Sequence, residues 1–140
     1  MSIAAAGRFH SAAIHALRHV RREDRATGVP PAQLSALSVL VFGGSRTLGG
    51  LASAEQVRPP TMTRIVQALE AEGLVRRESD PRDGRVQRLS ATAKGRRVMQ
   101  QARKRRVTNL ATLLERLSPA EITRVQESAK LVEQALAQEP

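Results

Sequence analysis

Polar and basic side chains share one face of a helix that the sequence predicts over residues 60–72. The opposite face is apolar, with the spacing i, i+3, i+4, i+7, and consists of Met62, Ile65, Val66 and Leu69. An arginine guanidinium can donate two hydrogen bonds to O6 and N7 of guanine, a glutamine amide can pair with adenine, and a threonine can bind phosphate or contact a thymine methyl group. The polar face therefore offers candidate nucleic-acid contacts, unless it is an ordinary solvated surface: Pro60, Thr61, Thr63, Arg64 and Gln67.

A second basic group lies in the segment Asp-Pro-Arg-Asp-Gly-Arg at residues 80–85. This segment separates two short stretches that read as strands, 74–78 and 86–90. Proline presets φ, and Gly84 is expected to supply a positive φ, so the segment predicts the turn of a β-hairpin. A disordered basic loop is the alternative. The side chains at the predicted tip are those of Arg82, Asp83, Gly84 and Arg85.

Positive charge is concentrated in one part of the chain. The 140 residues carry a formal net charge of +10, with 23 Lys and Arg against 13 Asp and Glu. Residues 58–106 hold fourteen of these basic residues and five of the acidic ones, and this excess indicates a polyanion-binding region. Within it, the basic run at 103–106 covers a full helical turn, so most of that run is expected to face solvent.

Residues for catalysis or metal binding do not form a familiar pattern. The chain has no cysteine, which excludes a disulfide framework and thiolate chemistry. His15 and His19 have the spacing i, i+4 of two metal ligands, but no third ligand has a compatible helical position. A Ser-His-Asp set, a carboxylate pair and a glycine-rich phosphate loop are all missing. The sequence therefore predicts a protein that is not an enzyme, binds no metal and needs no cofactor.

The elements that would position the basic groups are mainly helices. Apolar residues at helical spacing predict a first helix over 2–25, and Pro31 suits the first turn of a second helix over 31–43. Thr47 is expected to cap a short third helix, and Gly73 to end the helix over 60–72.

Two further helices carry apolar repeats. One is expected from Thr92 to about residue 117, and the other from Ser118, which begins a capping box. The apolar residues recur at intervals of three and four: Val107, Leu110, Leu114 and Leu117 in the first, and Ile122, Val125, Ala129, Val132 and Leu136 in the second. Such stripes on terminal helices indicate association with a second chain, and a helical hairpin within one chain is the alternative.

Two motifs resemble the MarR family of bacterial transcriptional regulators. The first is TMTRIVxxLExxGLVRR over residues 61–77, and the second combines DPRDGR at 80–85 with LSATAKG at 89–95. The match covers residues 31–97 by motif and the remaining helices by their order.

The resemblance implies a mostly α fold with a small two- or three-stranded β-wing. A single domain, 1–140, would combine a winged helix-turn-helix DNA-binding region at 31–91 with a helical dimerisation region at 1–25 and 92–140. The family acts as homodimers that bind double-stranded DNA at a pseudo-palindromic operator, so the resemblance implies a sequence-specific transcriptional regulator, a repressor. The chain begins with no signal-peptide pattern and contains no apolar run of membrane-spanning length, so a cytoplasmic protein without a membrane partner is expected.

The resemblance also implies roles for individual side chains. Arg64 would reach bases in the major groove, and Arg85, oriented by Asp83, would enter the minor groove. A small anionic effector would bind between the dimerisation helices and the winged domain and release the DNA. The predicted effector residues are the basic side of the first helix and one apolar neighbour: His15, Arg18, His19, Arg22 and Phe42. Alternatively, this side of the helix meets water or the partner chain.

One other function stays open at the level of sequence. A general basic nucleic-acid-binding protein without sequence specificity would carry a similar charge. RNA-binding proteins usually need stacking aromatic residues, however, and residues 58–106 contain none.

Overall fold

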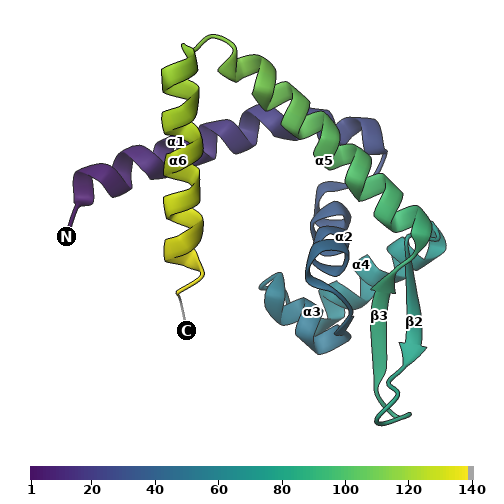
Figure 1. Ribbon diagram of the computed structural model, residues 1–140. Helices are drawn as coiled ribbons and strands as arrows, with labels where there is room; N and C mark the ends of the chain where they lie inside the picture. The colour runs from purple at the N-terminus through teal and green to yellow at the C-terminus, as the bar shows by residue number, and fades with distance from the viewer. Residues whose placement is uncertain (139–140) are drawn as a thin grey trace.

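The computed structural model describes residues 1–138, and in them a small antiparallel sheet lies at one edge of a set of helices (Figure 1). The elements are α1 (Ile3–Arg21), η1 (Arg22–Thr27), α2 (Pro31–Gly43), β1 (Arg46–Thr47), α3 (Leu48–Ala54), α4 (Pro59–Ala71), β2 (Val75–Ser79), β3 (Gln87–Ala91), α5 (Ala93–Leu114) and α6 (Pro119–Leu136). The expected mostly α fold with a β-wing is confirmed. Residues 139 and 140, which the predicted dimerisation region at 92–140 includes, lie outside the described residues.

The sheet has three strands in the order β1-β3-β2. The predicted strands at 74–78 and 86–90 each begin one residue later, because Leu74 and Val86 are engaged elsewhere. The Leu74 amide donates to the carbonyl of Leu69 at the end of α4, and the Val86 amide donates to Asp83 within the turn. Strand β1, with two residues, is too short to show an alternating pattern in the sequence.

The core lies between the sheet and helices α2, α3, α4 and α5. It is built from aliphatic and methionine side chains, as expected for a chain with two aromatic residues. The largest fully buried side chains are Leu37, Leu51, Met62, Val66, Leu69, Leu89 and Met99. Three of these belong to the predicted apolar face of α4, so that face is confirmed as the buried one.

Most predicted helix ends are confirmed. Thr47 accepts a hydrogen bond from the Gly50 amide, Ser118 forms the capping box with Glu121, and Gly73 has a φ of 69°. The first helix is an exception, because its α-helical part ends at Arg21 and tightens into η1. The Thr27 hydroxyl donates to the carbonyl of Asp24 there, at 2.7 Å.

The beginning of α5 holds the end of α4 through three consecutive carbonyl oxygens. Lys94 Nζ donates to the carbonyl of Glu72 at 2.7 Å, and the Thr92 hydroxyl donates to that of Gly73 at 2.6 Å. The Thr92 amide donates to the carbonyl of Leu74 at 3.0 Å. A Cβ atom at Gly95 would lie 2.2 Å from the same Leu74 oxygen. The motif at residues 89–95 therefore fixes α4 against α5.

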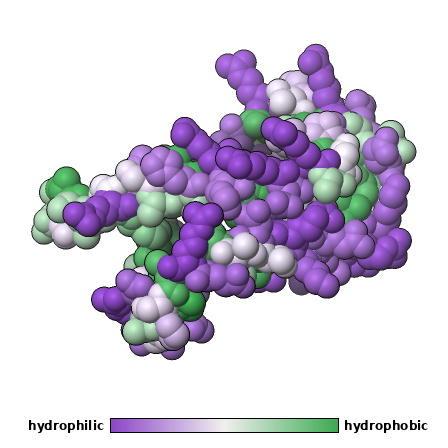
Figure 2. Space-filling model, turned by 90° about the horizontal axis from the view of Figure 1, so that it is seen from above, coloured by the Kyte–Doolittle hydropathy of each residue, from purple (hydrophilic) through white to green (hydrophobic). Residues whose placement is uncertain are grey.

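Helix α6 stands apart from the winged region (Figure 1), and none of its residues is buried. Seen from above, the start of α1 and the α6 region project from one side as two arms that carry green, hydrophobic residues (Figure 2).

The fifth helix ends at Leu114 rather than near residue 117, since the amides of Arg116 and Leu117 donate to the carbonyl oxygens of Leu113 and Leu114 in a tight turn. No single described helix is long and apolar enough to cross a membrane, although Ile3–Thr27 and Pro31–Gly43, bent by 94°, reach the necessary length and hydropathy together.

We expect Gly95→Ala to lower the free energy of unfolding by about 1–3 kcal/mol, because the added methyl group meets a backbone oxygen that cannot move away. Gly49→Ala is the matched control: Gly49 lies in α3 with no atom within 4 Å of the added Cβ, so its stability should stay unchanged or rise slightly. Urea unfolding of both variants measures the difference. Equal stability of the two variants would contradict the close approach.

Candidate nucleic-acid interface

Helix α4 presents its predicted polar face to solvent. Pro60, Thr61, Arg64 and Gln67 are exposed, and Thr63 is half-buried. The Thr63 hydroxyl donates its proton to the carbonyl of Pro59 at 3.0 Å, so it can offer a ligand its methyl group and lone pairs rather than a donor. The predicted residues of this helix thus lie on one surface.

The sequence of α4 favours a negatively charged ligand at its start. Pro59 and Pro60 occupy the first helical positions, where a missing amide proton costs nothing, and Arg58 precedes them in extended conformation. The first turn has no acidic residue, so the positive end of the helix dipole is not neutralised there. The acidic Glu70 near the other end is paired with Arg77, whose Nε lies 2.8 Å from its Oε1.

Aspartate side chains build the turn of the wing, the β2–β3 hairpin. Asp80 Oδ1 accepts from the Arg82 amide at 2.7 Å, and Asp83 Oδ1 accepts from the Arg85 amide at 3.0 Å. Gly84 does not have the expected positive φ; among the described residues, positive φ occurs at Gly28, Gly44, Gly73 and the non-glycine Gln56. The prediction for Gly84 was therefore wrong, because these side-chain hydrogen bonds close the turn without a left-handed residue.

Arg85 projects from the tip of the wing and is held by Asp83. Its side chain is 91% exposed, and its Nε and its terminal NH2 nitrogen lie 3.2 Å and 3.3 Å from the two Asp83 carboxylate oxygens. The hydrogen bonds from the Arg85 side chain and amide lower the pKa of Asp83, because they stabilise the ionised carboxylate. The contact expected between these residues is present. Arg82 is also exposed at the tip.

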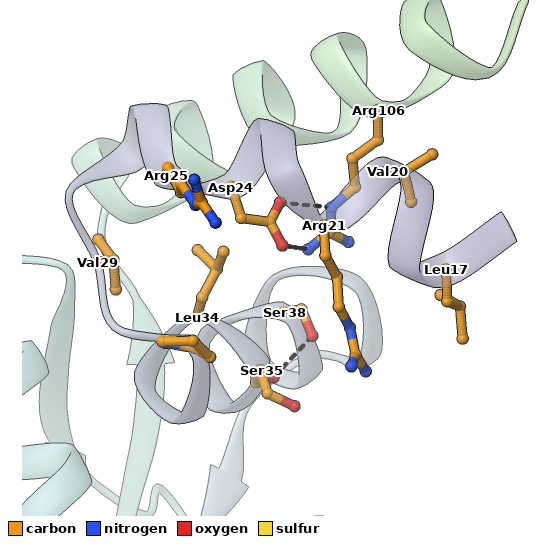
Figure 3. Close-up of a pocket in the computed structure, with 11 residues that line it drawn as sticks. Leu17, Val20, Arg21, Asp24, Arg25, Val29, Leu34, Ser35, Ser38 and Arg106 are labelled. Carbon is orange, nitrogen blue, oxygen red and sulfur yellow. Dashed lines mark hydrogen bonds and ion pairs between the residues drawn. The ribbon is translucent and has the colours of Figure 1, made fainter. Parts of the chain in front are cut away.

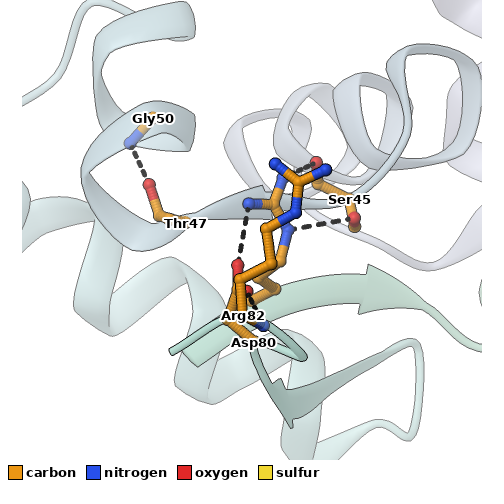
Figure 4. A network of polar contacts seen from close by, with 6 residues as sticks. Ser45, Thr47, Gly50, Asp80 and Arg82 are labelled. Atoms are coloured by element: carbon orange, nitrogen blue, oxygen red, sulfur yellow. Dashed lines mark hydrogen bonds and ion pairs between the residues drawn. The ribbon is translucent and has the colours of Figure 1, made fainter. Parts of the chain in front are cut away.

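The base of the wing contains a network that the sequence did not indicate. Arg88 in β3 contacts Asp80 and also Ser45, which lies 43 residues earlier in the chain, between α2 and β1 (Figure 4). No periodic pattern links positions so far apart. The sequence feature that could have suggested this network is the presence of a basic residue on the central strand together with an aspartate at the start of the turn.

The basic residues of α5 are less solvated than expected. In the run 103–106, Arg106 forms an ion pair with Asp24 of η1, and its Nε lies 2.6 Å from Asp24 Oδ1. The neighbouring Asn109 donates to Glu23 Oε1 at 2.9 Å. These contacts join α5 to η1 over more than 80 residues of sequence. Within the run, Arg103 and Lys104 are exposed as predicted, whereas Arg105 and Arg106 are half-buried.

A cavity of about 500 Å³ lies where α1, η1, α2 and α5 meet (Figure 3). Its wall includes the Arg106–Asp24 ion pair together with the guanidinium groups of Arg21 and Arg25. The other lining residues are Leu17, Val20, Val29, Pro31, Leu34, Ser35 and Ser38. The cavity therefore contacts both the first helix and the beginning of the winged region.

None of the predicted effector residues lines this cavity. His15, Arg18 and Arg22 are exposed, His19 is half-buried, and Phe42 is exposed near the end of α2, away from the cavity residues at the start of that helix. The cavity lies against the other side of the first helix, which carries Leu17, Val20 and Arg21. Within residues 1–138, no group of three or more His, Asp or Glu side chains is arranged to hold a metal ion.

Comparisons with known proteins agree with this geometry. A model of the MarR family matches residues 27–86. An HTH-type transcriptional regulator of Mycobacterium bovis is 36% identical over 115 residues, which cover 82% of this chain and 80% of that protein.

Solved structures show a similar fold. A transcriptional regulator from Thermotoga maritima has a TM-score of 0.80 and 25% identity, with 93% of this chain and 92% of that chain covered. A MarR family protein from Bacillus stearothermophilus has a TM-score of 0.79 and 24% identity, with 99% of both chains covered.

Proposed function

Since the chain belongs to the MarR family of transcriptional regulators and is a sequence-specific DNA-binding protein, we propose that it is a homodimeric repressor that binds a pseudo-palindromic operator and is released by a small anionic molecule. The observation that carries the DNA-binding part is the exposed, basic face of α4 beside a wing that presents Arg82 and Arg85. Family membership does not favour a general nucleic-acid-binding protein without specificity.

We assign base readout to α4 and backbone or minor-groove contacts to the wing. Arg64 is exposed, and within residues 1–138 it has no carboxylate partner, so its guanidinium is available for the paired acceptors of guanine. Gln67, one turn further along the same face, would read an adjacent base pair. Arg85 carries positive charge at the outer end of the hairpin, where a narrow minor groove would attract it.

Exposed apolar side chains support a dimer through α1, α5 and α6. Helix α6 has no buried residue, although isolated helices of this length are marginal in water. Large apolar side chains are exposed on these three helices and on the turn between α5 and α6: Ile3, Phe9, Leu17, Val107, Leu117, Val125, Leu131 and Leu136. A second copy would cover them and would place two α4 helices about a twofold axis, which requires an operator with matching symmetry.

The cavity described above is the proposed effector site. Arg21 and Arg25 line it, and within residues 1–138 neither guanidinium has a carboxylate partner. Apolar residues such as Leu17 and Leu34 complete the wall, which suits an aromatic carboxylate. Because the cavity lies between α1, α5 and α2, a ligand there would change how the dimer helices and the winged region are arranged.

The first prediction concerns base readout. Arg64→Ala should weaken binding to the preferred site by about 1–3 kcal/mol and relax base preference at one position in each half-site. Arg103→Ala on α5 removes the same charge from an exposed position and should leave base preference unchanged. Selection from random duplexes followed by fluorescence anisotropy measures both. Equal losses on selected and random DNA for Arg64→Ala would exclude base readout by this residue.

The second prediction concerns the dimer. Val125 is 40% exposed on the apolar stripe of α6, so Val125→Glu would place a charge in the interface and should produce monomers with greatly weakened DNA binding. Gln134→Glu adds the same charge on the opposite side of the helix and should remain dimeric. Light scattering at micromolar concentration distinguishes these results. A monomeric wild-type protein would contradict the proposal.

The third prediction concerns the effector, with salicylate as the probe. Arg25→Ala should lose salicylate binding in calorimetry, whereas Arg22→Ala, which removes an arginine outside the cavity, should retain it. Bound salicylate should weaken DNA binding by roughly 5- to 150-fold, and linkage requires DNA to weaken salicylate binding by the same factor. Equal salicylate binding by both variants would exclude the cavity as its site.

A further inference from the structure

Arg88 joins the base of the wing to the segment between α2 and β1. One of its terminal nitrogens lies 3.4 Å from Asp80 Oδ2, and the other donates to the backbone carbonyl of Ser45 at 3.1 Å. Its Nε lies 3.4 Å from the Ser45 hydroxyl oxygen. Figure 4 shows Ser45 and Asp80 on facing segments that this contact connects. One guanidinium group thus spans two segments that are separate in the sequence.

We propose that Arg88 is a positioning residue, which fixes the direction of the wing so that Arg85 meets the minor groove at a set distance from α4 in the major groove. This inference rests on the proposed function, because it assumes that Arg85 contacts DNA. Arg88 itself does not read the DNA in this proposal.

A hairpin of this length needs such support. Beyond the last register pair, Ser79 with Gln87, one short backbone hydrogen bond, from the Asp80 amide to the carbonyl of Val86 at 2.7 Å, joins the two sides before the turn. A two-stranded ribbon is marginally stable by itself, and β1 extends the sheet by two residues only. The guanidinium of Arg88 adds an attachment between the start of the turn and the segment before β1, which limits rotation of the turn relative to the helices.

The charges around Arg88 fit a role within the protein. Arg88 is opposite Glu78 in the strand register, but the Glu78 carboxylate is paired with Arg76, at 2.8 Å. The available carboxylate is that of Asp80, whose side chain is 15% exposed, against 37% for Arg88. The guanidinium is therefore directed toward protein oxygens rather than left free for phosphate.

The two oxygens of Asp80 have separate functions, which gives a clean test. Oδ1 accepts the Arg82 amide and shapes the turn, whereas Oδ2 holds Arg88. Asp80→Asn can keep the Oδ1 acceptor for the turn and removes the negative charge that binds Arg88. Loss of a negative charge near DNA would by itself leave binding unchanged or make it tighter. Weaker binding is expected only if the contact positions the wing.

The experiment uses the full-length protein and a duplex that the wild-type protein selects from a random-sequence library, with either A·T-rich or G·C-rich flanks. Asp80→Asn should weaken binding to the A·T-flanked duplex by roughly three- to tenfold and lower the preference for A·T flanks, as Arg85→Ala should. Adding Arg85→Ala to Asp80→Asn should weaken DNA binding little further, because both changes act on the same contact between Arg85 and the minor groove. Arg88→Lys keeps the charge but cannot bridge both segments, so it should behave like Asp80→Asn.

The outcomes separate the possible failures. Unchanged or tighter binding by Asp80→Asn, with a normal loss in Arg85→Ala, would overturn the role of Arg88 and leave the minor-groove contact intact. Wild-type flank preference in Arg88→Lys would also overturn it, because a lysine can replace a direct phosphate contact but not the bridge. Equal losses on both flanks, together with a lower melting temperature, would identify a merely structural contact. No effect of Arg85→Ala would remove the proposed minor-groove contact itself.

Discussion

The close approach of Gly95 to the carbonyl of Leu74 is the constraint on which the arrangement of this protein depends. It allows α5 to begin directly against the end of α4, where Thr92 and Lys94 satisfy carbonyl oxygens that the helix end and the following turn leave without partners. Those bonds are made by the Thr92 amide and by the side chains of Thr92 and Lys94. These contacts hold the end of α4 against the start of α5, the helix that leads to α6.

The arginine residues fall into two classes: those whose guanidinium groups bind oxygens of the protein, and those whose guanidinium groups are exposed to solvent. Arg88, Arg96 and Arg106 donate to oxygens of their own chain and hold elements together. Arg64, by contrast, is exposed without a carboxylate partner in the described part of the chain, and Arg85 shares the Asp83 carboxylate at a position that is almost fully exposed. A high net charge alone does not tell these classes apart. The hydrogen-bond partners do, and they show which part of the positive charge remains for a polyanion.

Local sequence patterns predicted the features that local interactions determine. The apolar spacing of α4, the cap of Ser118 and the left-handed Gly73 each depend on a few neighbouring residues, and each is confirmed. The surface positions of the candidate residues of α4 and of the wing tip were likewise predictable from residue type and spacing, and their contacts with DNA stay a prediction. The cavity and the contacts of Arg88 and Arg106 were not, since they join residues 43 to 82 positions apart and leave no periodic signal. Gly84 was misjudged because two aspartates perform the function assigned to its backbone.

The exposed apolar side chains of α1, α5 and α6 give the rigid junction between α4 and α5 a role in the proposed recognition of DNA. An α6 without buried residues gains little from its own chain, so in the proposed dimer its stability depends on the partner copy. In that dimer the packing of α1, α5 and α6 would set the distance between the two α4 helices, and the close contact at Gly95 would link α4 to this packing. The cavity lies beside the Arg106–Asp24 pair, which connects α5 to the segment preceding α2. In the proposed dimer, a ligand that alters this connection would act on the part of the molecule that determines the spacing of the two α4 helices.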